Sequence, residues 1–244
     1  MEIRRFDVMS NDRVAKNTYC LTLLGDCSAI TSPGQFVNIE LPGFFLRRPL
    51  SVCRVCGEVL TLVYKVVGEG TKKLAETHSG SLELMTGLGN GFDVDASGEA
   101  PLLVGGGAGV APMYWLAECL IAQGKKPRIA LGFNTEDEVC LAGELSKLGA
   151  AVMVATLDGT AGVRGFVTDA IEAAKPQYDY IYACGPEPML RAVYNMSGTD
   201  GEYSFEKRMA CGFGACMGCS CETKYGSKRI CRDGPVLKRS EIIW

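Results

Sequence analysis

The sequence lacks any apolar run long enough to cross a membrane. Nowhere among its 244 residues do 18 apolar residues follow one another, so no transmembrane helix is expected. The N-terminal stretch also lacks the apolar core of a signal peptide. We therefore expect a cytoplasmic protein that does not act at a membrane.

A strong charge of one sign is also missing, and histidine is scarce. The 25 basic and 28 acidic side chains give a formal net charge of −3, which provides no electrostatic reason to expect a nucleic-acid partner. His78 is the only histidine, and we expect it to be a solvated surface residue. No arrangement of Ser, His and Asp suggests a hydrolase.

Cysteine, by contrast, is abundant, with 12 residues. Without an export signal the cytosol keeps cysteines reduced, so disulfides do not explain this number. Seven are scattered and are predicted to be small buried hydrophobic residues: Cys20, Cys27, Cys53, Cys56, Cys119, Cys140 and Cys184. The other five crowd near the C-terminus, which suggests a metal site: Cys211, Cys216, Cys219, Cys221 and Cys231.

The pattern of the chain changes twice. Residues 1–97 consist of short β-rich runs separated by Gly and Pro, which predicts a small antiparallel barrel. Over residues 98–200 strand and helix patterns alternate, which predicts a parallel sheet with helices on its faces. Residues 201–244 are rich in Gly and Cys and poor in apolar side chains. A segment of this kind needs a metal to hold it together.

The cysteine spacing in the last segment predicts an iron–sulfur cluster. Cys211, Cys216, Cys219 and Cys231 follow the pattern C-x4-C-x2-C-x11-C, and the first three match the plant-type [2Fe–2S] run. A structural zinc site usually shows paired C-x2-C motifs, of which only one is present. Zinc and unligated cysteines remain the alternatives. Cys221 could replace one of the four ligands, and the spacing leaves that open.

A glycine-rich stretch follows the first buried strand pattern of the middle region. Gly105, Gly106, Gly107 and Gly109 stand between a predicted strand and a predicted helix. Such a loop lets backbone amides and a helix N-terminus approach a pyrophosphate. The spacing departs from the G-x-G-x-x-G fingerprint, so a tight turn without a ligand is the alternative.

A second strand-to-helix junction supports a nucleotide site. Cys184, Gly185 and Pro186 end another predicted strand, and two such junctions at the carboxyl ends of parallel strands define a nucleotide crevice. The acidic stretch 136–138 favours NAD over NADP, because a 2′-phosphate requires Arg or Lys. A solvated acidic loop is the alternative interpretation.

An arginine-rich strand in the first region suggests a flavin site. Arg48 precedes Pro49, Leu50 and Ser51. The guanidinium suits a pyrophosphate, and the serine can reach a flavin ring edge. Taken alone, this run is typical of a basic edge strand, and only the other motifs favour the flavin interpretation.

Together these motifs resemble the ferredoxin-reductase-like superfamily. They are R-P-L-S at 48–51, G-T at 70–71, GGGAGVAPM at 105–113, CGPEPM at 184–189 and the cysteine-rich tail. The resemblance covers essentially the whole chain and is greatest to the electron-transfer subunits of type 1B dihydroorotate dehydrogenases. MACGFGACMGCSC followed by CRDGPV is the most specific part of it.

The resemblance implies that the barrel binds FAD, the α/β domain binds NAD and the last segment holds a [2Fe–2S] cluster. By this resemblance, the flavin contacts fall on Arg48, Pro49, Leu50, Ser51, Val63, Tyr64, Lys65, Gly70 and Thr71. The cluster ligands fall on the four spaced cysteines. Cys184 is expected near the nicotinamide, where it helps to shape hydride transfer. A buried strand-end cysteine is the alternative.

The resemblance also implies a partner, an FMN-containing catalytic subunit that oxidises dihydroorotate in pyrimidine biosynthesis, in a heterotetramer with two copies of each chain. Electrons would pass singly through the cluster to FAD and leave as a hydride to NAD+. Two rival hypotheses remain. One is a reductase subunit of another complex, of the hydrogenase or ferredoxin:NADP oxidoreductase type. The other is a zinc-stabilised nucleotide-binding protein without redox activity.

Overall fold

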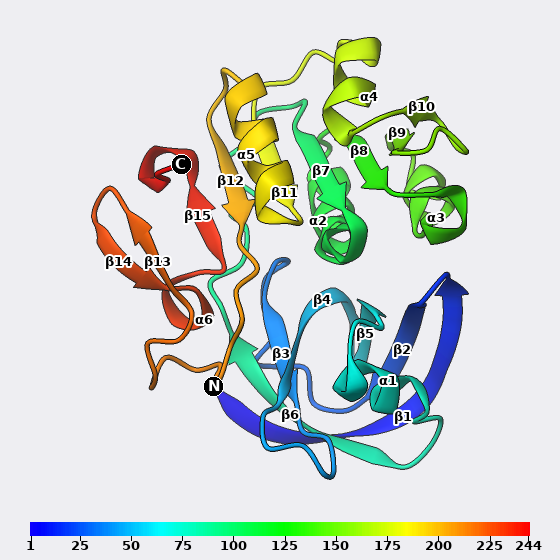
Figure 1. Cartoon of the computed structure of the whole chain (residues 1–244), viewed down its shortest axis with the longest axis vertical. Helices are drawn as coiled ribbons and strands as arrows, with labels where there is room; N and C mark the ends of the chain where they lie inside the picture. The colour runs from blue at the N-terminus through cyan, green and yellow to red at the C-terminus, as the bar shows by residue number, and fades with distance from the viewer.

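The first third of the chain forms a closed six-stranded barrel in the computed structural model, which describes residues 1–244 (Figure 1). Its strands are β1 (Glu2–Ala15), β2 (Thr18–Leu24), β3 (Phe36–Ile39), β4 (Arg48–Cys56), β5 (Val59–Lys65) and β6 (Ser81–Leu88), in the order β1-β2-β5-β4-β3-β6. Neighbouring strands are antiparallel. The predicted antiparallel barrel is therefore confirmed. Helix α1 (Glu69–Ala75) follows β5, and His78 just beyond it is exposed, as predicted.

The second part is a seven-stranded sheet with the order β10-β9-β8-β7-β11-β12-β15. Its strands are β7 (Leu102–Gly106), β8 (Arg128–Phe133), β9 (Ala151–Thr156), β10 (Val163–Arg164), β11 (Ile181–Cys184), β12 (Gly201–Ser204) and β15 (Val236–Lys238). The first six in the order are parallel, and β15 runs antiparallel to β12. The predicted parallel sheet is confirmed.

Helices cover both faces of this sheet because the side chains of its strands alternate. The helices are α2 (Val110–Ala122), α3 (Ala142–Lys147), α4 (Val167–Ala174) and α5 (Glu187–Met196), with short 3-10 turns η1 (Gly107–Gly109), η2 (Glu136–Glu138) and η3 (Arg239–Glu241). Leu103 of β7 packs in one core with residues of α2 and α3, whereas Leu102 and Val104 pack with residues of α4 and α5. This two-residue alternation separates the two helical layers.

The expected division at residue 200 stays a prediction, and the sheet runs across it. Strands β12 and β15 both follow residue 200 and form one edge of the sheet. Between them lie the cysteine-rich loop, the hairpin of β13 (Ser220–Thr223) and β14 (Gly226–Arg229), and the short helix α6 (Ile230–Asp233). Figure 1 shows this orange-to-red segment beside both the barrel and the sheet.

Ion pairs join the barrel to the α/β domain. Arg54 pairs with Glu118 of α2 at 2.8 Å. Lys65 at the end of β5 pairs with Glu138 at 2.8 Å, and Lys16 pairs with Asp137 at 2.9 Å. Two of the three acids in the 136–138 stretch therefore serve the contact between the two parts. None of the helices is long and apolar enough to span a membrane.

The prediction that the scattered cysteines are buried holds for most of them. Cys27, Cys53, Cys140 and Cys184 are buried, and Cys20 and Cys119 are half-buried. It is wrong for Cys56, which is exposed. Cys56 is the last residue of β4, next to the turn that leads into β5. Cys56 is exposed because no other part of the protein packs over this end of the hairpin.

Candidate functional site

The four spaced cysteines come together as two pairs of reduced thiols. The Sγ atoms of Cys211 and Cys216 lie 3.4 Å apart. The Cys231 thiol is hydrogen-bonded to the Cys219 side chain, and the Cys231 N–H also donates to the Cys219 sulfur at 3.4 Å. Nowhere do three or more His, Cys, Asp or Glu side chains converge as they would around one metal ion.

This arrangement fits a two-iron centre better than a single zinc ion. In a [2Fe–2S] cluster each iron takes two thiolates, so the four ligands divide into two pairs. A structural zinc ion draws four ligands to one point. The donor set is also purely thiolate, as in plant-type iron–sulfur clusters. The residues present therefore fit the group that the spacing predicted.

The loop prepares one thiol for metal binding through its backbone. Burial raises the pKa of the Cys211 thiol, but N–H groups of Cys216, Phe213 and Ala215 hydrogen-bond its sulfur and bring the pKa down to about 6. Since the thiolate is the form that binds metal, Cys211 is largely in the binding form at neutral pH. Burial raises the pKa of Cys231 to about 12, so metal binding there must release a proton.

Two glycines adopt backbone conformations that the cysteine-rich loop needs in order to turn. Gly212 and Gly214 have φ of +76° and +90°, a region in which other residues are strained. A Cβ at Gly214 would lie 2.8 Å from Cδ of Arg232, and the Gly214 carbonyl accepts a 2.6 Å hydrogen bond from Arg229. Cys221 lies in β13, and its thiol contacts the Glu222 carbonyl at 3.7 Å rather than one of the four cysteines.

The two glycine-containing junctions of the α/β domain meet at the centre of the sheet. Strands β7 and β11 are neighbours, with Gly105 opposite Cys184, although they are far apart in sequence. Strands β8 and β9 lie on one side of this pair and β12 on the other. The strand order thus reverses between β7 and β11, which is the switch point where open α/β sheets bind ligands.

Packing between the two junctions, rather than access for a ligand, explains most of these glycines. A Cβ at Gly109 would lie 2.5 Å from the Cys184 carbonyl carbon and 2.7 Å from Cα of Gly185. A Cβ at Gly106 would overlap the Met189 sulfur. Only Gly107 has open space around it, together with a φ of +54°. Among these four glycines, Gly107 is therefore the one whose backbone is open on this side.

Cys184 is held as a neutral thiol. It is 1% exposed, and burial raises its pKa well above the ordinary range while the nearby Glu206 carboxylate acts in the same direction. A hydrogen bond with the Ser204 side chain opposes these effects only in part. Cys184 can therefore affect a bound ligand only through the volume of its side chain, because it is neither a thiolate nucleophile nor a ready proton donor.

The arginine strand and the Gly-Thr motif lie against each other in the barrel. A Cβ at Gly70 would come within 2.6 Å of Cζ of Arg48, so the arginine side chain crosses the first turn of α1. Its guanidinium also stacks on the Phe44 ring, 4.7 Å from the centroid. The Thr71 hydroxyl accepts a 2.9 Å hydrogen bond from the Val67 N–H and donates to the Gly68 carbonyl at 3.0 Å. It thus caps α1.

The side chains of the third predicted flavin motif are engaged elsewhere. Tyr64 is 1% exposed and donates to Asn11 Oδ1 at 3.1 Å inside the barrel, and burial raises its pKa to about 12. Lys65 is paired with Glu138. Val63 packs between the two domains. A flavin contact from this strand would have to come from its main chain.

Sequence reasoning missed one residue next to the cysteine loop. The Asn38 side chain of β3 donates to the Cys211 carbonyl at 3.4 Å and is 1% exposed. The only signal for it is an asparagine within the otherwise apolar strand of Phe36–Ile39. Nothing local links that strand to a cysteine loop 173 residues away in the chain.

Comparisons with known proteins agree with this division of sites. A profile described as the iron–sulfur cluster binding domain of dihydroorotate dehydrogenase B matches residues 206–243. A profile described as an oxidoreductase NAD-binding domain matches residues 103–195. Neither of these two profile matches includes the barrel.

Similar proteins extend over the whole chain. The electron transfer subunit of dihydroorotate dehydrogenase B (NAD(+)) from Fusobacterium nucleatum subsp. nucleatum is 42% identical over 99% of both chains. The subunit of the same name from a Geobacillus species is 41% identical over 100% of this chain and 99% of its own. Among solved structures, an NADH-dependent reduced ferredoxin-NADP oxidoreductase shows 27% identity and a TM-score of 0.88, covering 98% of this chain and 90% of the other.

Proposed function

The chain belongs to the family of dihydroorotate dehydrogenase B electron transfer subunits, and from this we propose that it carries electrons from a catalytic partner to NAD+ through a [2Fe–2S] cluster and FAD. The observation that carries the proposal is the division of four cysteine thiols into two pairs, with 3.4 Å between the sulfurs of Cys211 and Cys216. A two-iron cluster needs this division and a zinc ion does not.

The proposed partner is a subunit that oxidises dihydroorotate at its own FMN. The two chains would form a heterotetramer with two copies of each, in the cytoplasm, as part of pyrimidine biosynthesis. The name of the relatives supports an NAD+-linked enzyme with a separate catalytic subunit. All 12 cysteines are free, which suits a reducing compartment.

A flavin suits the electron-transfer step between the cluster and NAD+, because it can take up electrons singly and release two together. An iron–sulfur cluster relays only one electron at a time. Arg48 is positioned to neutralise the flavin pyrophosphate, since its guanidinium already lies on the Gly70 turn. Ser51 follows in the same strand and offers a hydroxyl to the ring edge. Both contacts come from rigid β-structure, which keeps the flavin orientation constant.

In the α/β domain the open backbone at Gly107 and the start of α2 are positioned for the phosphates of NAD. Cys184 sits at the end of the neighbouring strand as a buried neutral thiol. We assign it the role of shaping the nicotinamide site by its volume. A preference for NAD over NADP rests on the relatives' name, because Asp137 and Glu138 are occupied by barrel lysines.

The cofactor content of the chain tests the proposal directly. Protein purified anaerobically should contain FAD, together with iron and acid-labile sulfide in equal amounts, and should show a visible spectrum of flavin plus [2Fe–2S]. A colourless protein that contains zinc but neither iron nor sulfide would refute it, and would favour a nucleotide-binding protein without redox activity.

The partner is tested by co-purification. The complex should reduce NAD+ when dihydroorotate is added, whereas this chain alone should oxidise NADH with an artificial acceptor but leave dihydroorotate unchanged. Oxidation of dihydroorotate by the isolated chain would contradict the proposal. Reduction of the chain by hydrogenase or reduced ferredoxin, with no response to dihydroorotate in the complex, would assign the chain to another enzyme.

A further inference from the structure

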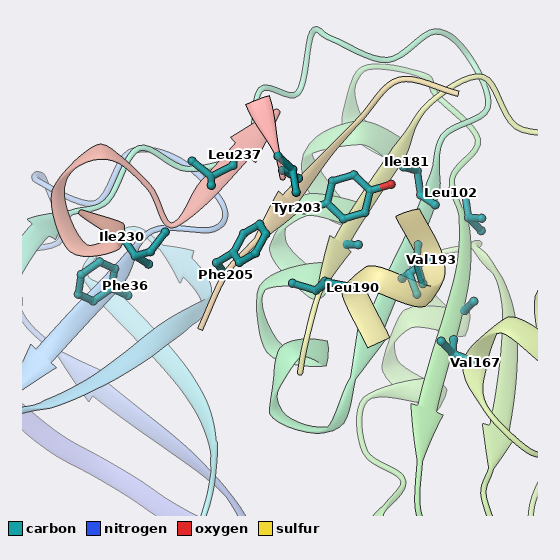
Figure 2. Close-up of a cluster of buried hydrophobic side chains, with 14 of the residues drawn as sticks. Phe36, Leu102, Val167, Ile181, Leu190, Val193, Tyr203, Phe205, Ile230 and Leu237 are labelled. Atoms are coloured by element: carbon teal, nitrogen blue, oxygen red, sulfur yellow. The ribbon is translucent and has the colours of Figure 1, made fainter. Parts of the chain in front are cut away.

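Strand β3 places Asn38 between the barrel and the C-terminal segment. Val37 and Ile39 point into the barrel core. Phe36 points to the other side, where it shares a core with Ile230 and Cys231 of the cluster segment, and Figure 2 shows Phe36 beside Ile230. Because strand side chains alternate, Asn38 lies on the same face as Phe36.

On that face Asn38 contacts the first predicted cluster ligand. Its Nδ2 donates to the Cys211 carbonyl at 3.4 Å. A carbonyl can only accept, so this contact fixes which end of the amide is the nitrogen. A Cβ at Gly212 would overlap the same nitrogen, so the loop folds closely over the amide. In the sheet, Asn38 is the register partner of Pro49 in the R-P-L-S strand.

Packing of the barrel does not explain an asparagine at this position. Asn38 is 1% exposed, and its Oδ1 is one of only two buried side-chain nitrogen or oxygen atoms without a hydrogen-bond partner, the other being Nε1 of Trp244. A buried amide oxygen without a donor is unfavourable, and an apolar side chain of the same size would avoid this cost. The hydrogen bond to the Cys211 carbonyl is therefore the contact that explains why an asparagine stands at this position.

We infer that Asn38 is a positioning residue for electron transfer: it ties the Cys211 end of the cluster loop to the strand pair that carries the flavin motif, and so sets the separation of cluster and flavin. The inference rests on the proposed function. Its physical basis is that outer-shell partners of metal ligands hold those ligands in place and commonly change metal affinity or activity 10- to 100-fold when removed.

Two substitutions separate this role from general packing. Asn38→Leu removes both polar groups and keeps the same branched arrangement of heavy atoms, and Asn38→Asp keeps the shape but replaces the donor with an acceptor that faces the Cys211 carbonyl. Thr86→Val is the matched control: Thr86 lies in β6, the strand next to β3, is fully buried, and its hydroxyl donates to the Glu2 carbonyl at 3.4 Å. The Thr86 hydroxyl makes no hydrogen bond to the cluster loop.

The holoprotein provides two readouts. The first is the rate at which iron passes to a chelator, which should rise about tenfold in both Asn38 variants and stay at the wild-type rate in Thr86→Val. The second is reduction by NADH, followed separately at the flavin and, by electron paramagnetic resonance, at the cluster. A bound flavin would take two electrons from NADH as a hydride and could pass them on to the cluster only one at a time. Flavin reduction should be unchanged and cluster reduction about tenfold slower.

Two results would overturn the inference. One is wild-type iron release and wild-type cluster reduction in both Asn38 variants. The other is slowing of flavin reduction and cluster reduction by the same factor, which would show a general loss of structure. Failure of the proposed function is a different outcome, because the wild-type protein itself would then lack iron, sulfide or flavin.

Discussion

The buried carboxyl of Glu202 should make the stability of this protein depend on pH. Glu202 lies in β12 and is 3% exposed. Its Oε2 accepts a 2.9 Å hydrogen bond from the N–H of Asp93, in the segment that connects the barrel to the sheet. Burial is the main cause that raises its pKa from 4.5 to about 7, and the Asp93 carboxylate and Glu241 act in the same direction. The hydrogen bond from Asp93 and the charge of Lys238 oppose the increase.

The sign of the effect follows from where the proton is bound. Between about pH 4.5 and pH 7 the folded protein keeps the Glu202 proton that the unfolded chain loses. Since the folded state binds more protons in this window, the free energy of unfolding falls as the pH rises through it and stays lower above pH 7. The difference between 4.5 and about 7 corresponds to about 3 kcal/mol at 1.36 kcal/mol per tenfold change in proton affinity.

Glu202→Gln tests this reasoning, because glutamine keeps a carbonyl oxygen for the Asp93 N–H and cannot ionise. The variant should be only slightly more stable than wild type at pH 5 and should exceed its stability at pH 8 by up to about 3 kcal/mol, or about 6–12 °C in Tm for a chain of this size. Thermal unfolding of both holoproteins at pH 5, 6, 7 and 8 measures the difference. Glu99→Gln, at an exposed position in the same connecting segment, is the control. An equal Tm difference at pH 5 and pH 8 would refute the argument.

Four further substitutions test the sites. Cys231→Ser should abolish iron incorporation but leave flavin content intact, whereas Cys221→Ser should retain the full iron content; equal iron loss in both would show that the pairing is wrong. Gly109→Ala places a Cβ 2.5 Å from the Cys184 carbonyl carbon, and overpacking of about 1–3 kcal/mol should raise the KM for NADH about tenfold or more in steady-state assays with an artificial acceptor. Arg48→Lys should weaken FAD binding about tenfold in equilibrium titrations, because an ammonium cannot replace a planar guanidinium; unchanged affinity would remove Arg48 from the flavin site.

The chemistry of the protein could be predicted from local sequence because it depends on closely spaced residues. The C-x4-C-x2-C run brings three ligands into one short loop whatever the rest of the fold does. Alternating strand and helix patterns likewise predict a parallel sheet, because such connections allow few other arrangements. The barrel, the sheet and the cysteine-rich segment are therefore all visible in the sequence, as is the resemblance to an electron-transfer subunit.

Tertiary structure decided what the remaining residues are for. The glycines at 106 and 109 predicted close approach of a phosphate, but two distant junctions pack against each other there. The resemblance implies a flavin contact at Tyr64, and in the structure its side chain lies inside the barrel. Each outcome depends on which strands are neighbours, and strand order is not encoded in any one segment.

The cysteine loop illustrates the same limit most clearly. Its spacing predicts four thiols as metal ligands, since those residues lie close in the chain. The position of the loop against the barrel depends on the contact between Asn38 of β3 and Cys211, which are 173 positions apart in the chain. Such contacts form only when β12 and β15 join the edge of the sheet and return the loop to the β3 face of the barrel. Local chemistry is therefore readable in the sequence, and the separation of the proposed cofactors is a property of the folded chain.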